Sequence, residues 1–476
     1  MRMLILKPIA GLCLMTAVAA YADDTEKPIP QDATKREAKD RGALAWSQRT
    51  ITEPFEKLAK KDPRWNAKAK AFITLAARIF SGPVGMDVSA EDAYKAGKEV
   101  VDAGCDDPLV LYIYTRLCGG PHYPGDDEYE RRMVASAAGM EKSHYPPIRR
   151  ATVLIRTAAL KARHRDDPAA QIEAKRLLAA GLELLPESVK VDGTGPEAWQ
   201  TWSDLVFEAF HSWKALGEDS KGAFDKVDEA LAKEPAVKAM RLKVRGGFYK
   251  TFAWESRGNG YANTVTEEAF RKFQERLEEA KKALEASWEA RPGDSDTATV
   301  MLDVELGMGE GDRDRMERWF RRAMEADPDN KKACTAKLKW LEPKWHGSPE
   351  AMLAFGKACR DTKNWRSGIP LILPEAHYAI TRYMKTEEQL KYHKSKPVYD
   401  DVYDVYTEYL KNVLDDSAAR TDFAAMSYLS ARKAVAHEQF EILGERIVPS
   451  KRFSESWLKQ IREDCAKHAN RKAAEK

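Results

Sequence analysis

The sequence predicts an all-α fold, an irregular solenoid built from antiparallel helix pairs. Apolar and small residues recur at helical spacing from about residue 46 almost to the end of the 476-residue chain. No stretch shows a sustained period of two with strand-type residues, so strands are not expected. The third observation is a local pattern that returns along the chain: an Ala-rich helix end, a short polar step and a proline.

The returning prolines predict the boundaries between repeats. The copies of the pattern end at Pro108, Pro147, Pro186, Pro235, Pro292 and Pro328. Proline has no amide hydrogen and disfavours helical geometry in the residue before it, so it ends one helix and can open the next. The shorter spacings lie near the periods of two-helix repeats, and the uneven ones indicate divergent repeats with insertions.

The first residues, "MRMLILKPIAGLCLMTAVAAYADD", have the pattern of a secretory signal. A basic start at Arg2 and Lys7 precedes an apolar run and a small-residue end, which predicts a signal peptide over residues 1–22. This run, like every later stretch, is shorter than the roughly 20 uncharged residues of a spanning helix. We therefore expect an exported chain, periplasmic or secreted, that does not insert into a membrane after signal cleavage.

Residues 23–45 are polar and contain proline, with too little apolar content to fold alone, and we expect a linker there. The repeat domain is expected over residues 46–370. Residues 371–476 are expected to form a C-terminal helical repeat and capping region, in which Gly444 stops one helix. A final amphipathic helix over about 454–468 would cover the open end of the stack, as solenoids require.

Two resemblances support this architecture. The segment "WFRRAMEADPDNKKA" resembles the second helix of a tetratricopeptide repeat, its turn and the start of the next repeat. Together, "GCDDPLVLYIYTRL", "FAWESRGNGYANTVTEEAFRKF" and "LKWLEPKWHGSPEAMLAFGKAC" resemble a family of exported bacterial proteins with a domain of unknown function on a tetratricopeptide-like base. The resemblance implies a tetratricopeptide-like α-solenoid and an exported location, and it supplies no catalytic residues.

The charge balance argues against nucleic acid as a partner. The chain carries 78 basic and 75 acidic residues, interspersed in sign as on solvated helix faces. Nucleic-acid binding needs a concentrated basic face, which this distribution does not indicate.

Five cysteines remain after residue 22, so at least one thiol is free or pairs between chains. Cys334 and Cys359 lie on two expected helices joined by a corner, and antiparallel helices bring residues on either side of a turn together. A disulfide between them is the pairing that we consider, because an exported chain meets oxidising conditions. Two free thiols are the alternative.

The corner itself, "LKWLEPKWHGSPEAM", carries the first candidate site. Trp340, Trp345 and His346 could form an aromatic platform with a titratable rim, suited to a sugar ring or a peptide side chain. The alternative is a structural corner in which Ser348 caps the helix that starts at Pro349 and the tryptophans pack inward. The capping pattern favours the corner.

The segment "FAWESRGNGYANTV", residues 252–265, is the second candidate. It joins Trp254, Glu255 and Arg257 to two glycines, in a long insert between repeats that we expect to be a loop. Neither a dinucleotide fingerprint nor a P-loop is present. Contacts that pin the loop are favoured over a ligand.

No motif identifies catalytic residues, a metal site or a cofactor. Glu441 stands where a zincin helix needs its second histidine, and no Gly-x-Ser-x-Gly elbow occurs. The sequence therefore favours a non-enzymatic binding or scaffold module whose concave wall holds a protein, a peptide or an envelope glycan. The alternative is a hydrolase-type enzyme with a groove near His346 and the 252–265 loop.

Overall fold

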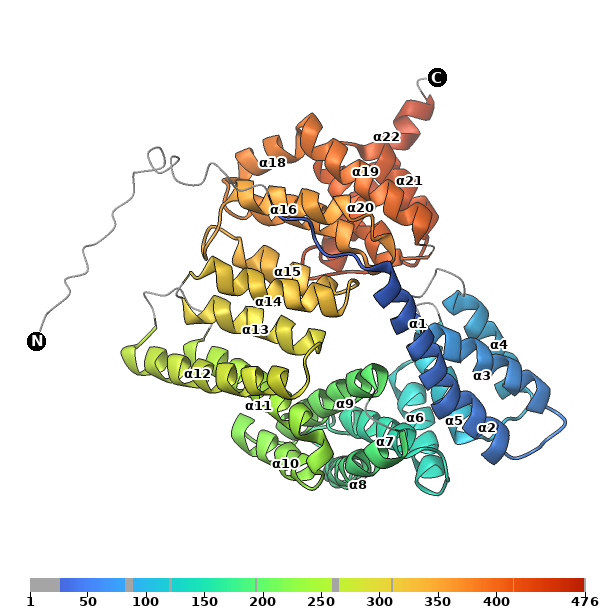
Figure 1. Cartoon of the computed structure of the whole chain (residues 1–476). Coiled ribbons are helices and arrows are strands. Elements are labelled where there is room, and N and C mark those ends of the chain that lie inside the picture. Colours follow the sequence, from blue (N-terminus) through green and yellow to red (C-terminus); the bar gives the residue numbers. More distant parts are fainter. Residues whose placement is uncertain are drawn as a thin grey trace, which may run out of the picture.

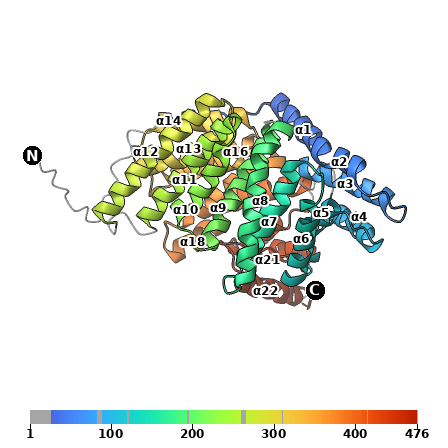
Figure 2. The ribbon, with the colours of Figure 1, turned by 90° about the horizontal axis from the view of Figure 1, so that it is seen from below.

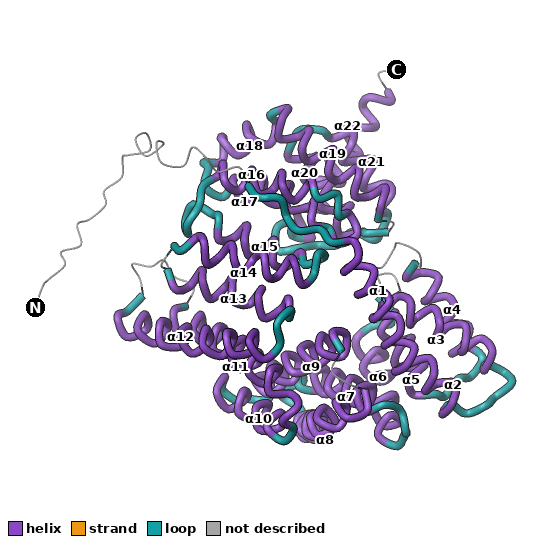
Figure 3. Tube along the Cα trace, viewed as in Figure 1, coloured by secondary structure: helices purple, strands orange, loops and turns teal. Residues whose placement is uncertain are grey.

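The computed structural model describes residues 26–81, 89–119, 122–192, 195–258, 265–309, 311–413 and 415–474. Within these ranges the chain consists of helices and their links, with no strand (Figure 3). The predicted all-α solenoid of antiparallel helix pairs is confirmed. The predicted signal peptide, residues 1–22, lies outside the described residues.

The helices of the first half are α1 (Ala33–Ser47), a π-helical turn (Gln48–Thr52), α2 (Glu53–Leu58), α3 (Asn66–Ser81), α4 (Ala90–Asp102), α5 (Pro108–Leu117), α6 (Asp126–Glu141), α7 (Pro147–Lys161), α8 (Pro168–Asp192), α9 (Pro196–Ala215), α10 (Ser220–Ala232), a 3-10 turn (Pro235–Val237) and α11 (Lys238–Arg257).

The second half contains α12 (Glu267–Ala290), α13 (Ser295–Met308), α14 (Arg313–Ala326), α15 (Lys331–Trp340), α16 (Pro349–Asp361), 3-10 turns η5 (Trp365–Ser367) and η6 (Ile369–Leu371), α17 (Ile372–Thr381), α18 (Thr386–Lys394), α19 (Lys396–Asn412), α20 (Ser417–Leu429), α21 (Lys433–Leu443) and α22 (Glu455–Ala474).

The helix pairs stack into two layers. Each pair joins neighbours in the chain, such as α7 with α8, α11 with α12 and α13 with α14. The first helices of successive pairs also contact one another, from α7 through α9, α11 and α13 to α15. Figure 1 shows α9 and α13 toward the middle of the molecule and α8, α10 and α12 toward its periphery. Figure 2, seen from below, shows α7 to α13 following one another across the molecule. The first helices therefore form an inner layer.

Most of the predicted repeat boundaries are confirmed. Pro108 and Pro147 are the first residues of α5 and α7, and Pro235 opens the 3-10 turn before α11. Pro292 and Pro328 lie in the short links before α13 and α15. Proline marks these ends because its fixed φ suits the first helical turn, where its missing amide hydrogen has no helical partner to lose.

Pro186 is the exception, and the predicted boundary there is wrong. It lies inside α8, which continues to Asp192, so the boundary falls just before Pro196. An interior proline removes one helical hydrogen bond, a cost that the buried Leu182 and Leu185 on the same helix help to offset through packing. Tertiary packing has overridden the local signal.

The apolar core is divided along the chain into large clusters. One runs from Trp46 to Phe248, a second from Ala253 to Ile380 with Ile29 added to it, and a third from Leu371 to Ile461. The second and third clusters meet at α17, which supplies Ile372 to one and Leu373 to the other. The expected division near residue 370 therefore falls where the two clusters share a helix, and the division into domains stays a prediction.

The polar segment before residue 46 is folded, which corrects the expected linker over the described part of 23–45. Asp32 caps α1 by accepting from the backbone amides of Thr34 and Lys35, and Ile29 is buried in the second core cluster, with 7% of its surface exposed. The polar composition predicted an unfolded linker, because it could not show that this segment is held mainly by polar contacts to residues far along the chain.

The predicted helix stop at Gly444 is confirmed, and the last helix is longer than expected, reaching Ala474, while its role as a cap stays a prediction. Gly444 ends α21 at a positive φ of 57°, a conformation that favours glycine. The last helix, α22, packs on α20 and α21 with Leu458 and Ile461 buried beneath it. None of the helices in the described ranges combines the length and apolar character of a membrane span.

Candidate functional site

The segment between α15 and α16 is a structural corner. Trp340 is the last residue of α15, and the Ser348 hydroxyl accepts from the Ala351 amide at 3.2 Å, which caps α16 with Pro349 at its first position. At Gly347, an added Cβ would lie 2.3 Å from the Leu341 carbonyl oxygen, so only glycine fits this close approach. The capping role predicted for Ser348 is confirmed.

The aromatic residues of this corner pack against each other and against the core. Trp340 belongs to the second core cluster and is 3% exposed, while Trp345 packs against that cluster. The His346 ring lies 4.8 Å from the Trp340 ring, and burial lowers the pKa of His346. The Trp340 ring is therefore covered by protein and offers no open stacking face.

The residues of the second candidate lie on a helix and not in a loop. Trp254, Glu255 and Arg257 occupy the last turn of α11, which ends at Gly258. The expected loop over residues 252–257 is therefore wrong, and residues 259–264 lie outside the described part. The unusual length between prolines here comes mainly from two long helices, α11 and α12.

The two segments that the sequence singled out separately come together in space. The rings of Trp254 and Trp345 meet edge to face, with centroids 5.9 Å apart, and Phe273 of α12 meets Trp254 at 5.0 Å. Lys339 and Arg257 lie over the Trp254 ring, at 5.4 and 5.5 Å from its centroid. This cluster joins α11, α12 and the corner as a packing unit.

Glu255 is a paired carboxylate. It accepts from Lys214 Nζ and from the Ser220 hydroxyl, each at 2.6 Å. Burial alone would raise the pKa of Glu255, but these two partners lower it below its usual value. Glu255 borders an open hollow of about 470 Å³ between α11 and α12, beside Arg276. An ionised, paired carboxylate lacks the proton that a general acid must donate.

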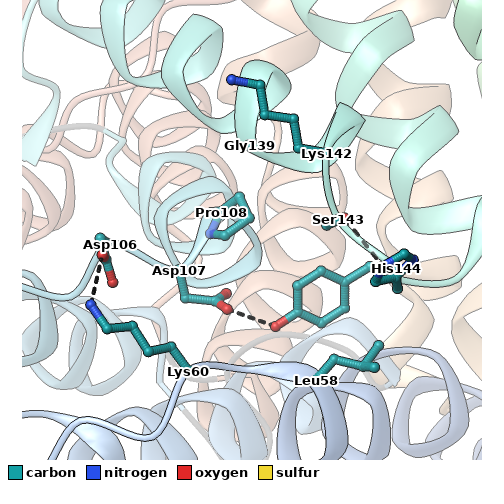
Figure 4. A pocket seen from close by; sticks show the side chains of 10 residues that line it. Leu58, Lys60, Asp106, Asp107, Pro108, Gly139, Lys142, Ser143 and His144 are labelled. Carbon is teal, nitrogen blue, oxygen red and sulfur yellow. Dashed lines mark hydrogen bonds and ion pairs between the residues drawn. The ribbon is translucent and has the colours of Figure 1, made fainter.

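A second hollow, of about 340 Å³, lies among α5, α6 and the link after α2 (Figure 4). Its most buried acid, Asp107, caps α5 and accepts a hydrogen bond of 2.8 Å from the Tyr145 hydroxyl. Lys60 and Asp106 form an ion pair at its rim. The polar groups of this hollow therefore form their hydrogen bonds and ion pair with one another and with the start of α5. Their roles are structural and do not indicate a ligand.

Cys334 and Cys359 lie beside each other in the core, as their placement on either side of the corner predicts. Both are fully buried and carry free thiols in this structure. Burial, together with the adjacent Cys334 thiol, raises the pKa of Cys359. Their pairing stays a prediction. Within the described ranges, no group of three metal-ligating side chains could hold a metal ion.

The inner face of α9 carries a row of exposed side chains that sequence inspection missed. Gln200, Asp204, Phe207 and His211 are exposed and follow one another at helical spacing. Phe207 is 63% exposed, and the His211 ring meets it edge to face at 4.3 Å. We call these four residues the inner strip.

The surroundings of Asp204 place this strip on the inner side of the solenoid. Although the Asp204 side chain is exposed, the protein that surrounds it removes part of its water and raises its pKa, and Gln200 partly offsets this through a hydrogen bond of 3.1 Å. The other charges that act on Asp204 are Lys332 of α15, Asp296 of α13 and Arg156 of α7. Since these helices lie far apart in the sequence, Asp204 faces across the inner layer.

The charges next to the inner strip are largely paired with each other. Arg156 pairs with Glu208 at 3.4 Å. Further ion pairs of this wall are Lys243 with Asp296 at 3.1 Å, Lys250 with Asp303 at 3.4 Å and Lys339 with Asp303 at 3.8 Å. These pairs link α11, α13 and α15 and leave the wall without one dominant sign of charge.

A sequence signal for the strip exists in "PEAWQTWSDLVFEAFHSWKA". Trp199, Trp202, Leu205 and Trp213 recur at helical spacing and are buried. Phe207 lies off that buried face, which is where a helix normally carries polar residues. The same helix contains so many aromatic residues that Phe207 does not stand out by composition.

The fold and this inner wall define the chain as an α-solenoid. No family model matches the sequence, and a comparison with curated proteins gives no match.

Among solved structures, yeast Tom70 is similar to this chain at 12% identity and a TM-score of 0.28, over 92% of this chain and 87% of that one. A circular tandem repeat protein is similar at 13% identity and a TM-score of 0.21, over 92% and 93%. The structure of Naa15/Naa10 bound to HypK gives 11% identity and a TM-score of 0.20, over 86% and 61%. Likenesses this distant carry no functional argument.

Proposed function

We propose that this protein is a non-enzymatic binding module that holds a polypeptide segment against the inner strip of α9. The observation that carries the proposal is the exposure of Phe207 between Asp204 and His211. A phenylalanine that leaves most of its surface in water is unfavourable, by about 25 cal/mol for each Å² that a partner could cover. A ligand that covers it therefore gains affinity.

The chemistry of the strip indicates the kind of ligand. Phe207 suits an apolar side chain, and Asp204 suits a basic side chain beside it, because its carboxylate has no close cationic partner among the ion pairs of the wall. His211 and Gln200 add polar groups at either end of the strip. An extended peptide with an apolar and a basic side chain in succession matches this arrangement.

The location of the protein forms part of the proposal. We propose that it is exported, which the basic start, apolar run and small-residue end over residues 1–22 support. Its partner would then be a protein or peptide of the cell envelope or exterior, and a glycan remains the competing ligand class. The proposed relation to exported bacterial proteins with a tetratricopeptide-like base rests on the same segments of sequence.

The hydrolase alternative finds less support in the geometry. Glu255, the acid of the 252–265 segment, is ionised and paired, and His346 packs on Trp340 within the corner. A glycosidase needs one carboxyl group that keeps its proton near neutral pH, which requires a raised pKa. Asp204 has a raised pKa, but Asp296, the carboxylate that acts on it, is held in an ion pair with Lys243.

The experiment begins by panning a phage-displayed peptide library on the purified protein and synthesising the peptides that it selects. We expect an apolar and a basic side chain to be enriched. Phe207→Ala should then weaken binding of the selected peptide by about tenfold or more, as expected for an aromatic anchor at the centre of an interface. Asp204→Asn should weaken it by less, and more strongly at low salt.

The matched control is Phe270→Ala on α12, which removes an aromatic side chain of similar exposure, 52%, from the outer layer. It should leave the affinity unchanged. The proposal fails when both alanine variants bind equally well, when a glycan array and not the peptide library yields the ligand, or when the selected peptides are cleaved.

A further inference from the structure

The folded N-terminal segment connects the first helices of the repeat stack to the turn between α14 and α15. We call residues 26–40 the N-terminal clasp. The clasp continues into the rest of α1, which packs on α3 and α9, while the polar side chains of the clasp contact the region from α14 to η5. Figure 1 shows this segment running from beside α16 down to α3. The clasp therefore closes the curved stack into a ring.

The clasp binds the turn between α14 and α15. Lys35 donates to the Glu325 carbonyl oxygen at 2.6 Å, and Gln31 donates to the Pro328 carbonyl oxygen at 3.0 Å. Glu325 is among the last residues of α14, where carbonyl groups lack helical partners and attract cations. The turn that ends a repeat thus also serves as an acceptor for the N-terminal segment.

Ion pairs add to this contact. Arg36 pairs with Asp329 at 3.0 Å, and Lys39 pairs with Asp327 at 2.8 Å. Arg366 of η5 pairs with Asp40 at 2.7 Å. Each of these pairs is partly exposed to water, so each stabilises little by itself and is weakened by salt.

The first part of the clasp is anchored more deeply. Glu26 forms an ion pair with Lys337, whose side chain is 1% exposed and lies over the rings of Phe320 and Phe355. Lys337 has a second carboxylate, Glu317, at 2.8 Å. When Glu26 leaves, Lys337 still has a counter-charge, so departure of the clasp does not leave a bare buried cation.

The apolar share of the contact is small. In residues 26–40, Ile29 is the one buried apolar side chain, and the residues of α1 up to Asp40 are exposed or half-buried. A segment held by polar groups and one apolar anchor opens at lower free energy than helices that share a continuous core. The clasp can therefore open while the repeats stay folded.

We propose that the N-terminal clasp is a detachable, salt-sensitive latch that switches the solenoid between a closed ring and an open curve. Opening separates the N-terminal helix pairs from the turn between α14 and α15. Because α1 also packs on α9, which carries the inner strip, opening widens access to that strip. This last consequence rests on the proposed function, whereas the latch itself does not.

The test uses the full chain and the triple variant R36A/K39A/D40A, which removes three ion pairs of the clasp and leaves the pair between Arg366 and Asp329 in place. Hydrogen–deuterium exchange should show amides of α1 exchanging at least tenfold faster than in the wild type, with α13 to α16 unchanged. Small-angle X-ray scattering should show a larger radius of gyration. The wild type should approach this behaviour when salt rises from about 0.05 to 0.5 M.

The matched control is K396A/K411A, which removes two exposed ion pairs within α19, to Asp400 and Glu408. It should change neither α1 exchange nor the radius of gyration. The latch is contradicted if the amides of α1 stay as protected as those of α13, in the triple variant and in the wild type at high salt. It is also contradicted if α1 and α13 always lose protection together. The wild-type salt series gives this answer even when the triple variant does not fold.

Peptide association separates the two proposals. With the latch and the binding function both correct, the triple variant should bind the selected peptide with a faster association rate. Faster α1 exchange with no peptide binding to any variant overturns the binding function and leaves the latch in place. Peptide binding at an unchanged rate, with α1 protected, overturns the latch alone.

Discussion

Lys337 shows how a single buried charge is tolerated in this core. Its ammonium group lies among Glu26, Glu317 and two phenylalanine rings, with almost no contact with water. Such a charge destabilises a fold unless its partners remain, since removing one partner leaves the desolvation cost uncompensated.

Glu317→Gln should therefore lower the free energy of unfolding by about 2 kcal/mol, because Lys337 keeps only Glu26. In a chain that carries Lys337→Met, the further loss caused by Glu317→Gln should be much smaller, since no buried ammonium group then loses its partner. Urea unfolding of the two single variants and the double variant measures the coupling. Additive losses in the double variant would contradict the pairing.

His393 predicts a specific loss of stability in acid. Its side chain is 3% exposed and its Nδ1 atom has no hydrogen-bond partner, while His377 lies nearby. Burial, and to a lesser extent His377, lowers the pKa of His393 to about 4. The imidazole is neutral in the folded protein over the pH range in which it becomes charged when unfolded.

The unfolded chain thus binds a proton below about pH 6.5 that the folded chain does not bind until about pH 4. Above about pH 6.5, His393 should not change the free energy of unfolding. As the pH falls from there to 4, the difference in proton binding should lower the free energy of unfolding by up to about 3 kcal/mol. His393→Phe should flatten this part of the stability curve, measured by urea unfolding at successive pH values. Replacing the exposed His144 by Gln should leave the stability curve unchanged. Equal slopes of the free energy of unfolding against pH in the two variants would contradict the assignment to His393.

At the scale of helices, local signals predicted ends well and contacts between distant helices poorly. The caps at Ser348 and Gly444 and most boundary prolines could be read from the sequence, because each depends on a few adjacent residues. The meeting of Trp254 with Trp345 could not, since it depends on how α11 packs against the corner. The clasp escaped prediction for the same reason, because its partners lie in α14, α15 and η5.

Two adjacent helices carry the prediction about cysteines. Because the Cys334 and Cys359 thiols lie side by side across the corner, oxidising conditions should link α15 to α16. The crosslink should raise stability by about 3 kcal/mol on the chain-entropy estimate. Peptide maps with and without reductant identify the bond, and Cys359→Ser serves as the control. Two free thiols in protein purified from an oxidising compartment would contradict this prediction.

At the scale of the whole molecule, the architecture explains why the candidate site in the structure differs from the sites that the sequence indicated. The solenoid prediction was confirmed because helical periodicity recurs along the chain and each pair buries its apolar faces against its neighbours. The aromatic residues chosen from the sequence turned out to pack between helices, where solenoids need large side chains. The inner strip became visible only when the curvature placed α9 opposite α13 and α15.

The most direct test of this account is hydrogen–deuterium exchange on the whole protein with and without a peptide selected from the library. Binding to the inner strip predicts slower exchange in α9 and in the facing helices α7, α13 and α15, with α12 and the 341–348 corner unchanged. Protection confined to that corner, or to the hollow between α11 and α12, would contradict the central claim that the ligand binds on the inner face.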